Sequence, residues 1–203
     1  MKLYFRPFAC SLAARIALEE AGLDAEFIQV VDGGRLPDGR DFTEISPMGY
    51  VPAIETAGFT LTEGPAVLTY IAELAPEGAL AFTGFSDAHY RMLAWLNFVS
   101  TELHKAVFIP LLGKGYSEAE QAAARARAAR PFAVLSKHLE GRELLDDRFT
   151  VADAYLLAVL NWCEFSKVPI ADWPVLLGYR ERLRARPSVA RAMAAEMPLL
   201  KAA

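Results

Sequence analysis

The chain has 203 residues, with 21 Lys and Arg against 25 Asp and Glu, and a formal net charge of −4 at pH 7. This length allows one large domain or two small ones, and the acidic balance argues against nucleic-acid binding. No apolar run approaches the roughly 20 residues of a membrane span. The sequence shows no signal-peptide pattern, and its two cysteines are too far apart to suggest a disulfide framework, which favours a cytoplasmic protein. The cysteines also lack the spacing of a zinc site, so we expect no metal.

Short elements alternate over the first 75 or so residues. "KLYF" is β-prone, and the helical spacing of Leu12 and Ile16 predicts a helix from Ser11 to Ala21 that ends at Gly22. "AEFIQVV" predicts a strand, and the Gly-, Pro- and Asp-rich residues 32–50 predict a long loop. "VPAIET" and "FTLTE", joined by "AG", predict a β-hairpin.

The next helix is predicted to begin near Pro65, because the missing N–H of a proline costs nothing in the first turn. Its expected buried face consists of Val67, Leu68, Ile71 and Leu74. Residues 75–87 have the Pro and Gly density of a linker, and long helical periodicities follow. We therefore expect a mixed α/β domain over residues 1–78 and an all-helical domain over residues 87–203.

Cys10 lies near the start of the first predicted helix. Backbone N–H groups and the helix dipole stabilise a thiolate at such a position and lower the pKa of the thiol. The alternative is that Cys10 is a small apolar residue at a turn. Cys163 lies in the apolar, helical stretch "LNWCEFS", and we expect it to be a buried structural thiol.

Two further stretches suggest a binding site. In "WLNFVSTELHKA", Asn97, either Ser100 or Thr101, and His104 share one helical face, as a cleft wall does. "TEGPAV" places Glu63 and a free backbone N–H at a helix N-terminus, where a carboxylate ligand is bound favourably. The alternative for Glu63 is that it only caps its own helix.

Five motifs in this order resemble the cytosolic glutathione transferases, and most closely the bacterial beta class. They are "KLYFRPFACSLAARIAL", "ISPMGYVPAI", "LTEGPAVLTYIAE", "WLNFVSTELHK" and "RFTVADAYL". The last contains a capping box of Thr150 and Asp153, which has a structural role. The resemblance covers essentially the whole chain. It implies an α/β thioredoxin-like N-terminal domain that binds glutathione and an all-α C-terminal domain that contributes the electrophile pocket.

The resemblance also implies which residues bind glutathione. The Val51–Pro52 bond is expected to be cis, so that the Val51 backbone pairs with the cysteinyl part of glutathione. Glu63 and the Gly64 N–H are expected to bind its γ-glutamyl end. Where close relatives have a lysine near the glycyl carboxylate, this chain has Gly34, and Arg35 is the nearby cation.

At the glutathione sulfur, the resemblance implies Cys10 as the central residue and His104 as its partner, which can hold or shift a proton if its pKa is near 6.5. Ser11 is expected to be a second donor to the sulfur, and Tyr4 to be packed. Asn97 and Thr101 are expected to line the same cleft. The candidate electrophile pocket consists of Phe108, Ile109, Leu112, Trp162 and Phe165, although core packing explains most of these residues equally well.

The function expected is therefore a detoxifying glutathione S-transferase, with glutathione as co-substrate, a small electrophile as partner and a homodimeric assembly. One alternative is a glutathione-dependent thiol-disulfide oxidoreductase or isomerase that uses Cys10, because a cysteine can form a mixed disulfide with glutathione. A third hypothesis is a binding protein that keeps the fold without catalysis. The retained Cys10, Val51-Pro52, Glu63 and His104 argue against it.

Overall fold

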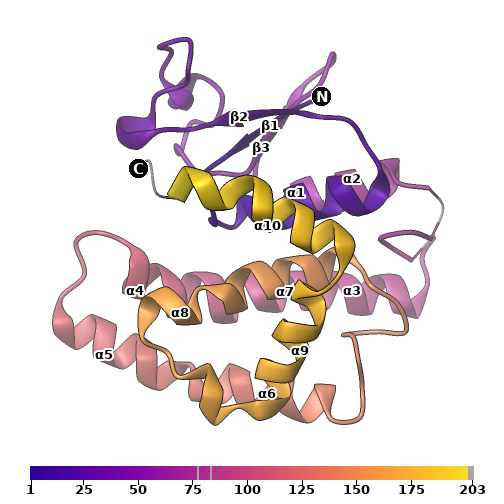
Figure 1. Ribbon diagram of the computed structural model, residues 1–203, viewed down its shortest axis with the longest axis vertical. Helices are drawn as coiled ribbons and strands as arrows, with labels where there is room; N and C mark the ends of the chain where they lie inside the picture. Colours follow the sequence, from indigo (N-terminus) through magenta and orange to yellow (C-terminus); the bar gives the residue numbers. More distant parts are fainter. Residues whose placement is uncertain (77, 83, 201–203) are drawn as a thin grey trace.

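A computed structural model describes residues 1–76, 78–82 and 84–200 of the chain. A four-stranded sheet in the order β2-β1-β3-β4 forms the N-terminal part (Figure 1). β1 (Lys2–Phe5) pairs in parallel with β2 (Glu26–Gln29) and antiparallel with β3 (Ala53–Glu55). β4 (Thr60–Leu61) completes the predicted hairpin with β3. The sheet is thus the small mixed sheet of the expected thioredoxin-like fold.

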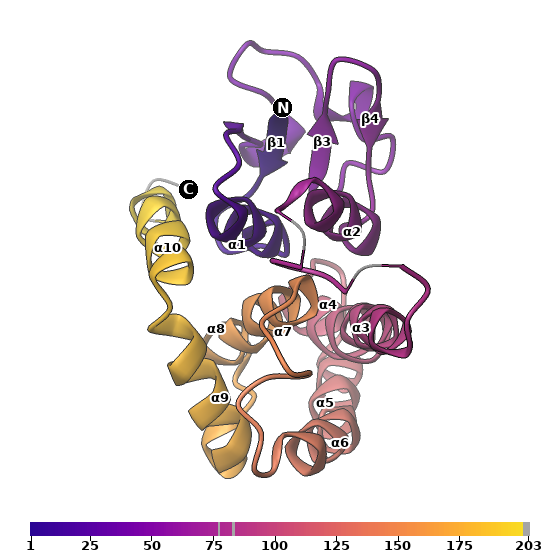
Figure 2. The same cartoon turned by 90° about the vertical axis from the view of Figure 1, so that its right-hand side faces the viewer.

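Helices α1 (Ser11–Ala21) and α2 (Gly64–Leu74) lie between the sheet and the helical part of the chain (Figure 2). α1 has the predicted bounds and ends at Gly22, which adopts a left-handed φ of 65°. α2 buries Val67, Leu68, Ile71 and Ala72, whereas Leu74 is 43% exposed. The assignment of Leu74 to the buried face was therefore wrong, because this last residue of the helix projects beyond the packed surface.

The predicted loop between β2 and β3 contains two short 3₁₀ turns. They are η1 (Asp32–Gly34) and η2 (Phe42–Glu44), and Asp41 and Glu44 cap the second reciprocally. Phe42 anchors this loop, because it is buried beneath the far face of the sheet against Tyr4, with ring centroids 5.6 Å apart. Tyr4 is fully buried, as expected, and its hydroxyl donates to Glu55.

The rest of the described chain is helical, as predicted. α3 (Asp87–Phe98) continues directly into a π-helical segment, η3 (Val99–Phe108), and then into the single turn α4 (Ile109–Leu112). The elements that follow are α5 (Glu118–Arg127), α6 (Ala129–Leu139), α7 (Val151–Asn161), α8 (Cys163–Ser166), η4 (Ile170–Asp172), α9 (Pro174–Arg184) and α10 (Pro187–Leu200). Residues 77, 83 and 201–203, which fall in the predicted linker and C-terminal domain, lie outside the described residues. The predicted domain boundaries at residues 78 and 87 stay a prediction.

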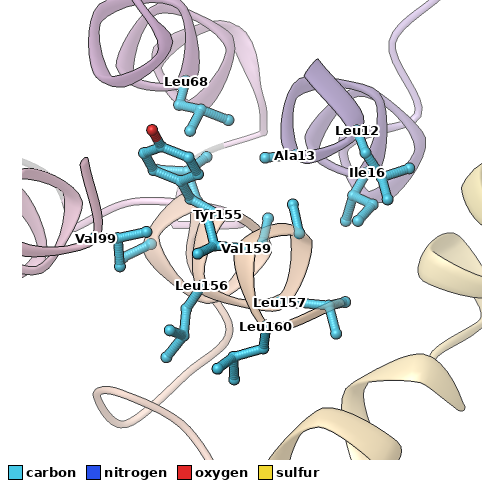
Figure 3. Close-up of a cluster of buried hydrophobic side chains, with 14 of the residues drawn as sticks. Leu12, Ala13, Ile16, Leu68, Val99, Tyr155, Leu156, Leu157, Val159 and Leu160 are labelled. Atoms are coloured by element: carbon cyan, nitrogen blue, oxygen red, sulfur yellow. The ribbon is translucent and has the colours of Figure 1, made fainter. Parts of the chain in front are cut away.

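α7 is the centre of the core, and all of its residues are buried. Figure 3 shows it packed against Leu12, Ala13 and Ile16 of α1, Leu68 of α2 and Val99 of η3. The predicted capping box starts this helix, because Asp153 accepts from the Thr150 backbone N–H at 2.9 Å. The second oxygen of Asp153 accepts from the Leu145 N–H and from the hydroxyl of Tyr179. Asp153 is thus structural, as expected.

Within the part of the chain that the structure describes, no helix combines the length and apolar character needed to cross a membrane.

Candidate active site

Two adjoining cavities lie where the N-terminal α/β part meets the helical part. The wide cavity, with a volume of about 620 Å³, is bounded by the loop Arg6–Cys10, the C-terminal half of η3 with α4, and the segment around Trp162. The narrow cavity is bounded by the turn before β3, the start of α2 and the middle of η3. Five residues line both cavities, and so mark their junction: Cys10, Tyr50, Val51, His104 and Lys105.

Cys10 precedes the first residue of α1, and its thiol donates to the carbonyl oxygen of Val51 at a distance of 3.0 Å. Burial raises the pKa of this thiol to about 12, although the charge of Lys105 and the backbone N–H groups of Cys10 and Ser11 act in the opposite direction. The expectation of a lowered pKa was therefore wrong for the free protein. Desolvation of the thiolate outweighs the helix N-terminus.

The Val51–Pro52 peptide bond is cis, as the resemblance implied. The Val51 carbonyl accepts from Cys10, and among the described residues the Val51 N–H has no hydrogen-bond partner. Val51 precedes β3 directly, and it lines both cavities. Its backbone can therefore pair with an extended peptide ligand as an added strand does.

Glu63 immediately precedes α2 and has a left-handed φ of 68°, which is uncommon for a residue with a side chain. Its side chain makes no capping hydrogen bond to α2, so the alternative that Glu63 only caps its own helix is not supported. Glu63 and Gly64 both line the narrow cavity. A carboxylate and the positive end of a helix thus meet at one wall, which suits a ligand with an ammonium and a carboxylate.

His104 is buried, and its Nδ1 lies 2.6 Å from the hydroxyl of Tyr155. Its ring packs edge-on against Trp162, with ring centroids 4.9 Å apart. Burial, assisted by the charge of Lys105, lowers the pKa of His104 to about 4. The expectation of an imidazole with a pKa near 6.5 was therefore wrong. His104 shares both cavities with Cys10, but its hydrogen bond goes to Tyr155 and that of Cys10 to Val51.

Ser11 does not reach the cavities. It is fully buried, and its hydroxyl bonds the backbone N–H and the carbonyl of Arg6, both at 3.2 Å. The expected second donor to the sulfur is therefore not found at Ser11. This residue instead fixes the start of the loop that carries Cys10.

The structure also places Asn97 and Thr101 away from the cavities. Both are exposed, and both side chains bond backbone carbonyls one turn earlier in the helix. The alternative, Ser100, lines the narrow cavity. The reason is the π-helical winding of η3, in which the i→i+5 hydrogen bonds widen the turn, so that Ser100, four residues before His104, stays in line with it. Thr101, three residues before, rotates away.

Arg35 is exposed in the loop after β2, where it contacts the Gly39 carbonyl, and it lines neither cavity. The cation at the junction is Lys105, whose Nζ lies 4.9 Å from the ring centroid of Tyr50. Sequence reasoning missed Lys105, although its position directly after His104 was a usable signal. Tyr155 was also missed, because it lies in an apolar stretch that indicates only core.

All five residues predicted for an electrophile pocket line the wide cavity: Phe108, Ile109, Leu112, Trp162 and Phe165. The lining also includes Arg6, Lys105 and Lys114, and no Asp or Glu side chain is among the described residues that bound it. The described residues contain no cluster of His, Cys, Asp or Glu that could hold a metal ion. Cys163 is buried, as expected.

Comparison with known proteins gives matches over most of the chain. Residues 9–74 match the family model of the glutathione S-transferase N-terminal domain, and residues 89–187 match that of the C-terminal domain. Glutathione S-transferase GstA of Escherichia coli O157:H7 is 35% identical over 199 residues, covering 97% of this chain and 98% of that protein.

Solved structures agree with this similarity. The structure of a sphingomonad glutathione S-transferase complexed with glutathione is 40% identical, with a TM-score of 0.91 over 97% of this chain and 98% of that one. A bacterial beta class glutathione S-transferase of Sphingomonas chungbukensis is 38% identical, with the same TM-score and the same coverage of both chains. The similarity therefore extends through both parts of the fold.

Proposed function

The chain belongs to the glutathione S-transferase family, and from this premise we propose that glutathione binds along the residues of the narrow cavity with its sulfur at the junction, while the wide cavity holds the electrophile. The protein is an enzyme of the transferase class. The observation that supports the two-cavity assignment is the junction, where Cys10, Val51, His104 and Lys105 line both cavities. The sulfur of a glutathione bound at this junction can contact an electrophile in the wide cavity directly, because the two cavities adjoin there.

In the reaction, the glutathione thiol loses its proton to solvent, and the thiolate sulfur attacks an electrophilic carbon. A carbon–sulfur bond forms while the bond to the leaving group breaks, and the leaving group departs with the bonding electrons. Holding both reactants in contact supplies much of the acceleration, because the encounter becomes an intramolecular step.

For glutathione, we assign the cysteinyl part to the backbone of Val51 and the γ-glutamyl end to Glu63 and Gly64. The carboxylate of Glu63 meets the ligand's ammonium, and the N-terminus of α2 meets its carboxylate. Lys105 replaces Arg35 as the candidate cation for the glycyl carboxylate, because Lys105 lines the narrow cavity and Arg35 does not.

Cys10 and His104 are assigned to the sulfur. At neutral pH the Cys10 thiol is protonated and can donate to a thiolate, because its pKa is raised to about 12. The neutral ring of His104 is also available as a donor. Both residues therefore stabilise the negative sulfur by hydrogen bonds to the charged form, which lower the pKa of the glutathione thiol.

A second candidate function is glutathione-dependent thiol-disulfide exchange at Cys10, favoured by the position of its sulfur at the junction. The Cys10 thiolate attacks a glutathionyl disulfide, forms a mixed disulfide and releases the other thiolate; a second glutathione thiolate then resolves the adduct as glutathione disulfide. The raised pKa of Cys10 disfavours this reaction at neutral pH. Isomerisation by thiolate addition and elimination is a related use of the same site.

We further propose that the protein is a cytoplasmic, homodimeric member of the beta class with a role in detoxification. Its similarity to the beta class enzyme supports the class. Two free cysteines suit a reducing compartment. Exposed aromatic residues, among them Phe59 and Tyr90, suit an interface with a second copy, which sedimentation equilibrium would test.

The assignment of the narrow cavity is tested by isothermal titration with glutathione. Glu63→Gln removes the charge that meets the ligand's ammonium, and we expect affinity to fall at least about tenfold. Glu73→Gln, an exposed Glu on the same helix α2, is the matched control and should bind like wild type. Equal affinities of the two variants would refute the assignment.

A further inference from the structure

His104 and Tyr155 form a hydrogen-bonded pair beside the junction of the cavities. Tyr155 comes from α7 and points toward Leu68 of α2 (Figure 3), whereas His104 comes from η3. Both side chains are buried, and the Tyr155 hydroxyl lies 2.6 Å from Nδ1 of His104. One short hydrogen bond therefore fixes the orientation of a ring that faces the sulfur position.

The direction of this hydrogen bond follows from the chemistry of the two groups. Burial raises the pKa of Tyr155 above its ordinary value, while the pKa of His104 is lowered to about 4, so both groups are neutral at pH 7. An imidazole nitrogen is a better acceptor than a phenol oxygen, and a phenol is a good donor. The Ser100 hydroxyl opposes this rise in the pKa of Tyr155, as a donor near the phenol oxygen does. Tyr155 therefore donates to Nδ1.

We propose that Tyr155 is a positioning residue that holds His104 in the tautomer protonated at Nε2, so that the ring presents an N–H donor to the glutathione sulfur. With Nδ1 occupied, the other ring nitrogen carries the proton. Among the described residues Nε2 has no hydrogen-bond partner, and His104 lines both cavities. This inference rests on the proposed function, because the acceptor is the sulfur of glutathione.

The groups that face the pair are Cys10 at the start of α1, Glu63 before α2, and Lys105 beside His104 on η3. Trp162, directly after α7, covers one side of the ring. Cys10 donates to Val51, so it does not compete for Nδ1. The positive charge of Lys105 further disfavours a charged imidazolium, so His104 acts as a hydrogen-bond donor and not as a base that stores the thiol proton.

The first test reads the tautomer in the free protein. In protein labelled with ¹⁵N-histidine, the nitrogen shifts and their long-range proton correlations identify which ring nitrogen is protonated, and His104→Gln assigns its signals among the three histidines. We expect wild type at pH 7 to be protonated at Nε2. Protonation at Nδ1 overturns the proposal, and this measurement requires no folded Tyr155 variant.

The second test compares two buried hydroxyl deletions. Tyr155→Phe should shift His104 toward the other tautomer, raise the pKa of bound glutathione by about one unit, and lower kcat/KM at pH 7 about tenfold. Tyr179→Phe is the matched control, because Tyr179 is equally buried and donates to Asp153 at 2.8 Å, outside both cavities. It should change thermal stability without changing the tautomer or the thiol pKa, which is read from thiolate absorbance.

The remaining outcomes separate this proposal from the proposed function. In a His104→Gln background, Tyr155→Phe should have no further effect on the thiol pKa if it acts through the ring. Equal effects of Tyr155→Phe and Tyr179→Phe overturn the positioning role. Failure of wild type to bind glutathione overturns the proposed function, while the tautomer of the free protein is decided independently by the nitrogen spectrum.

Discussion

At the residue scale, two opposing effects act on the Cys10 thiol. The N-terminus of α1 and Lys105 favour the thiolate, whereas burial opposes it and raises the pKa to about 12. The sequence indicates the helix start, but it does not indicate that the thiol becomes partly buried where the two cavities meet. The sequence also leaves Ser11 as a candidate donor to the sulfur. Only the fold shows that the Ser11 hydroxyl is already hydrogen-bonded to the backbone of Arg6.

The raised pKa of Cys10 predicts slow, strongly pH-dependent adduct formation with glutathione disulfide. Between pH 7 and 9 the thiolate is a minor species, so the rate should rise about tenfold for each pH unit. Mass spectrometry against time measures this rate, and Cys10→Ser should form no adduct while it retains conjugation of 1-chloro-2,4-dinitrobenzene. A rate that levels off near pH 7 would show that the thiol is already ionised there.

Gly64 allows a second prediction at this scale. A Cβ added there would meet the Tyr155 hydroxyl oxygen at 3.7 Å and Pro52 at 4.0 Å, which are ordinary contacts. Gly64→Ser should therefore fold normally and place a new hydroxyl donor at the wall of the narrow cavity. We expect a severalfold gain in glutathione affinity by titration calorimetry, since one net hydrogen bond contributes about 1 kcal/mol. Unchanged or weaker binding would place the γ-glutamyl end elsewhere.

At the element scale, the helices show where sequence patterns suffice. Local signals gave the bounds of α1, with its end at Gly22, and the capping box at the start of α7. The π-helical winding of η3, which packs against α7, has no such signal in the residue pattern. Because η3 is π-helical and not α-helical, Ser100 lines the narrow cavity in place of the predicted Thr101.

The C-terminal helix α10 touches the loop that carries Cys10, and its contact predicts a pH dependence. Glu196 is fully buried and accepts from the Phe8 N–H at 2.7 Å, while the Phe8 carbonyl accepts from the Trp162 indole at 2.7 Å. Burial raises the pKa of Glu196 from 4.5 to about 7. As the pH rises, Glu196 therefore ionises in the unfolded chain before it ionises in the folded protein. The free energy of unfolding falls by roughly 3 kcal/mol between pH 4.5 and about 7.

Glu196→Gln keeps an acceptor for Phe8 and removes the titration. We expect the difference in unfolding free energy between pH 4.5 and 7.5, measured with urea, to shrink by most of that amount. Glu19→Gln is the control, because it removes an ion pair with Arg191 between the same two helices, α1 and α10, at the surface. A variant with the wild-type pH dependence would exclude Glu196 as the titrating group.

At the scale of the whole molecule, the two cavities exist because the α/β part and the helical part enclose them jointly. The motifs and the resemblance gave this fold and the five apolar residues of the wide cavity. They did not give the charges of the wide cavity. Arg6 lies in the loop after β1, Lys105 in η3 and Lys114 in the loop after α4, and only the tertiary structure brings these segments together.

No acidic side chain among the described lining residues offsets the charge of these cations. We therefore expect the enzyme to prefer negatively charged aromatic electrophiles over neutral ones. 4-Chloro-3-nitrobenzoate should be favoured over 4-chloro-3-nitrobenzamide about tenfold in kcat/KM, after division by the uncatalysed rate with glutathione. Lys114→Gln should reduce this preference and Lys137→Gln, an exposed lysine on α6, should not. A preference for the neutral amide would contradict the prediction.

A crystal structure with S-(2,4-dinitrophenyl)glutathione would show whether the peptide and the electrophile bind in the two adjoining cavities. We predict the peptide along Val51 and Glu63 in the narrow cavity, the sulfur beside Cys10 and His104, and the dinitrophenyl ring against Phe108 and Trp162. A conjugate bound with its ring outside the wide cavity, or with its peptide away from Val51, would contradict this account.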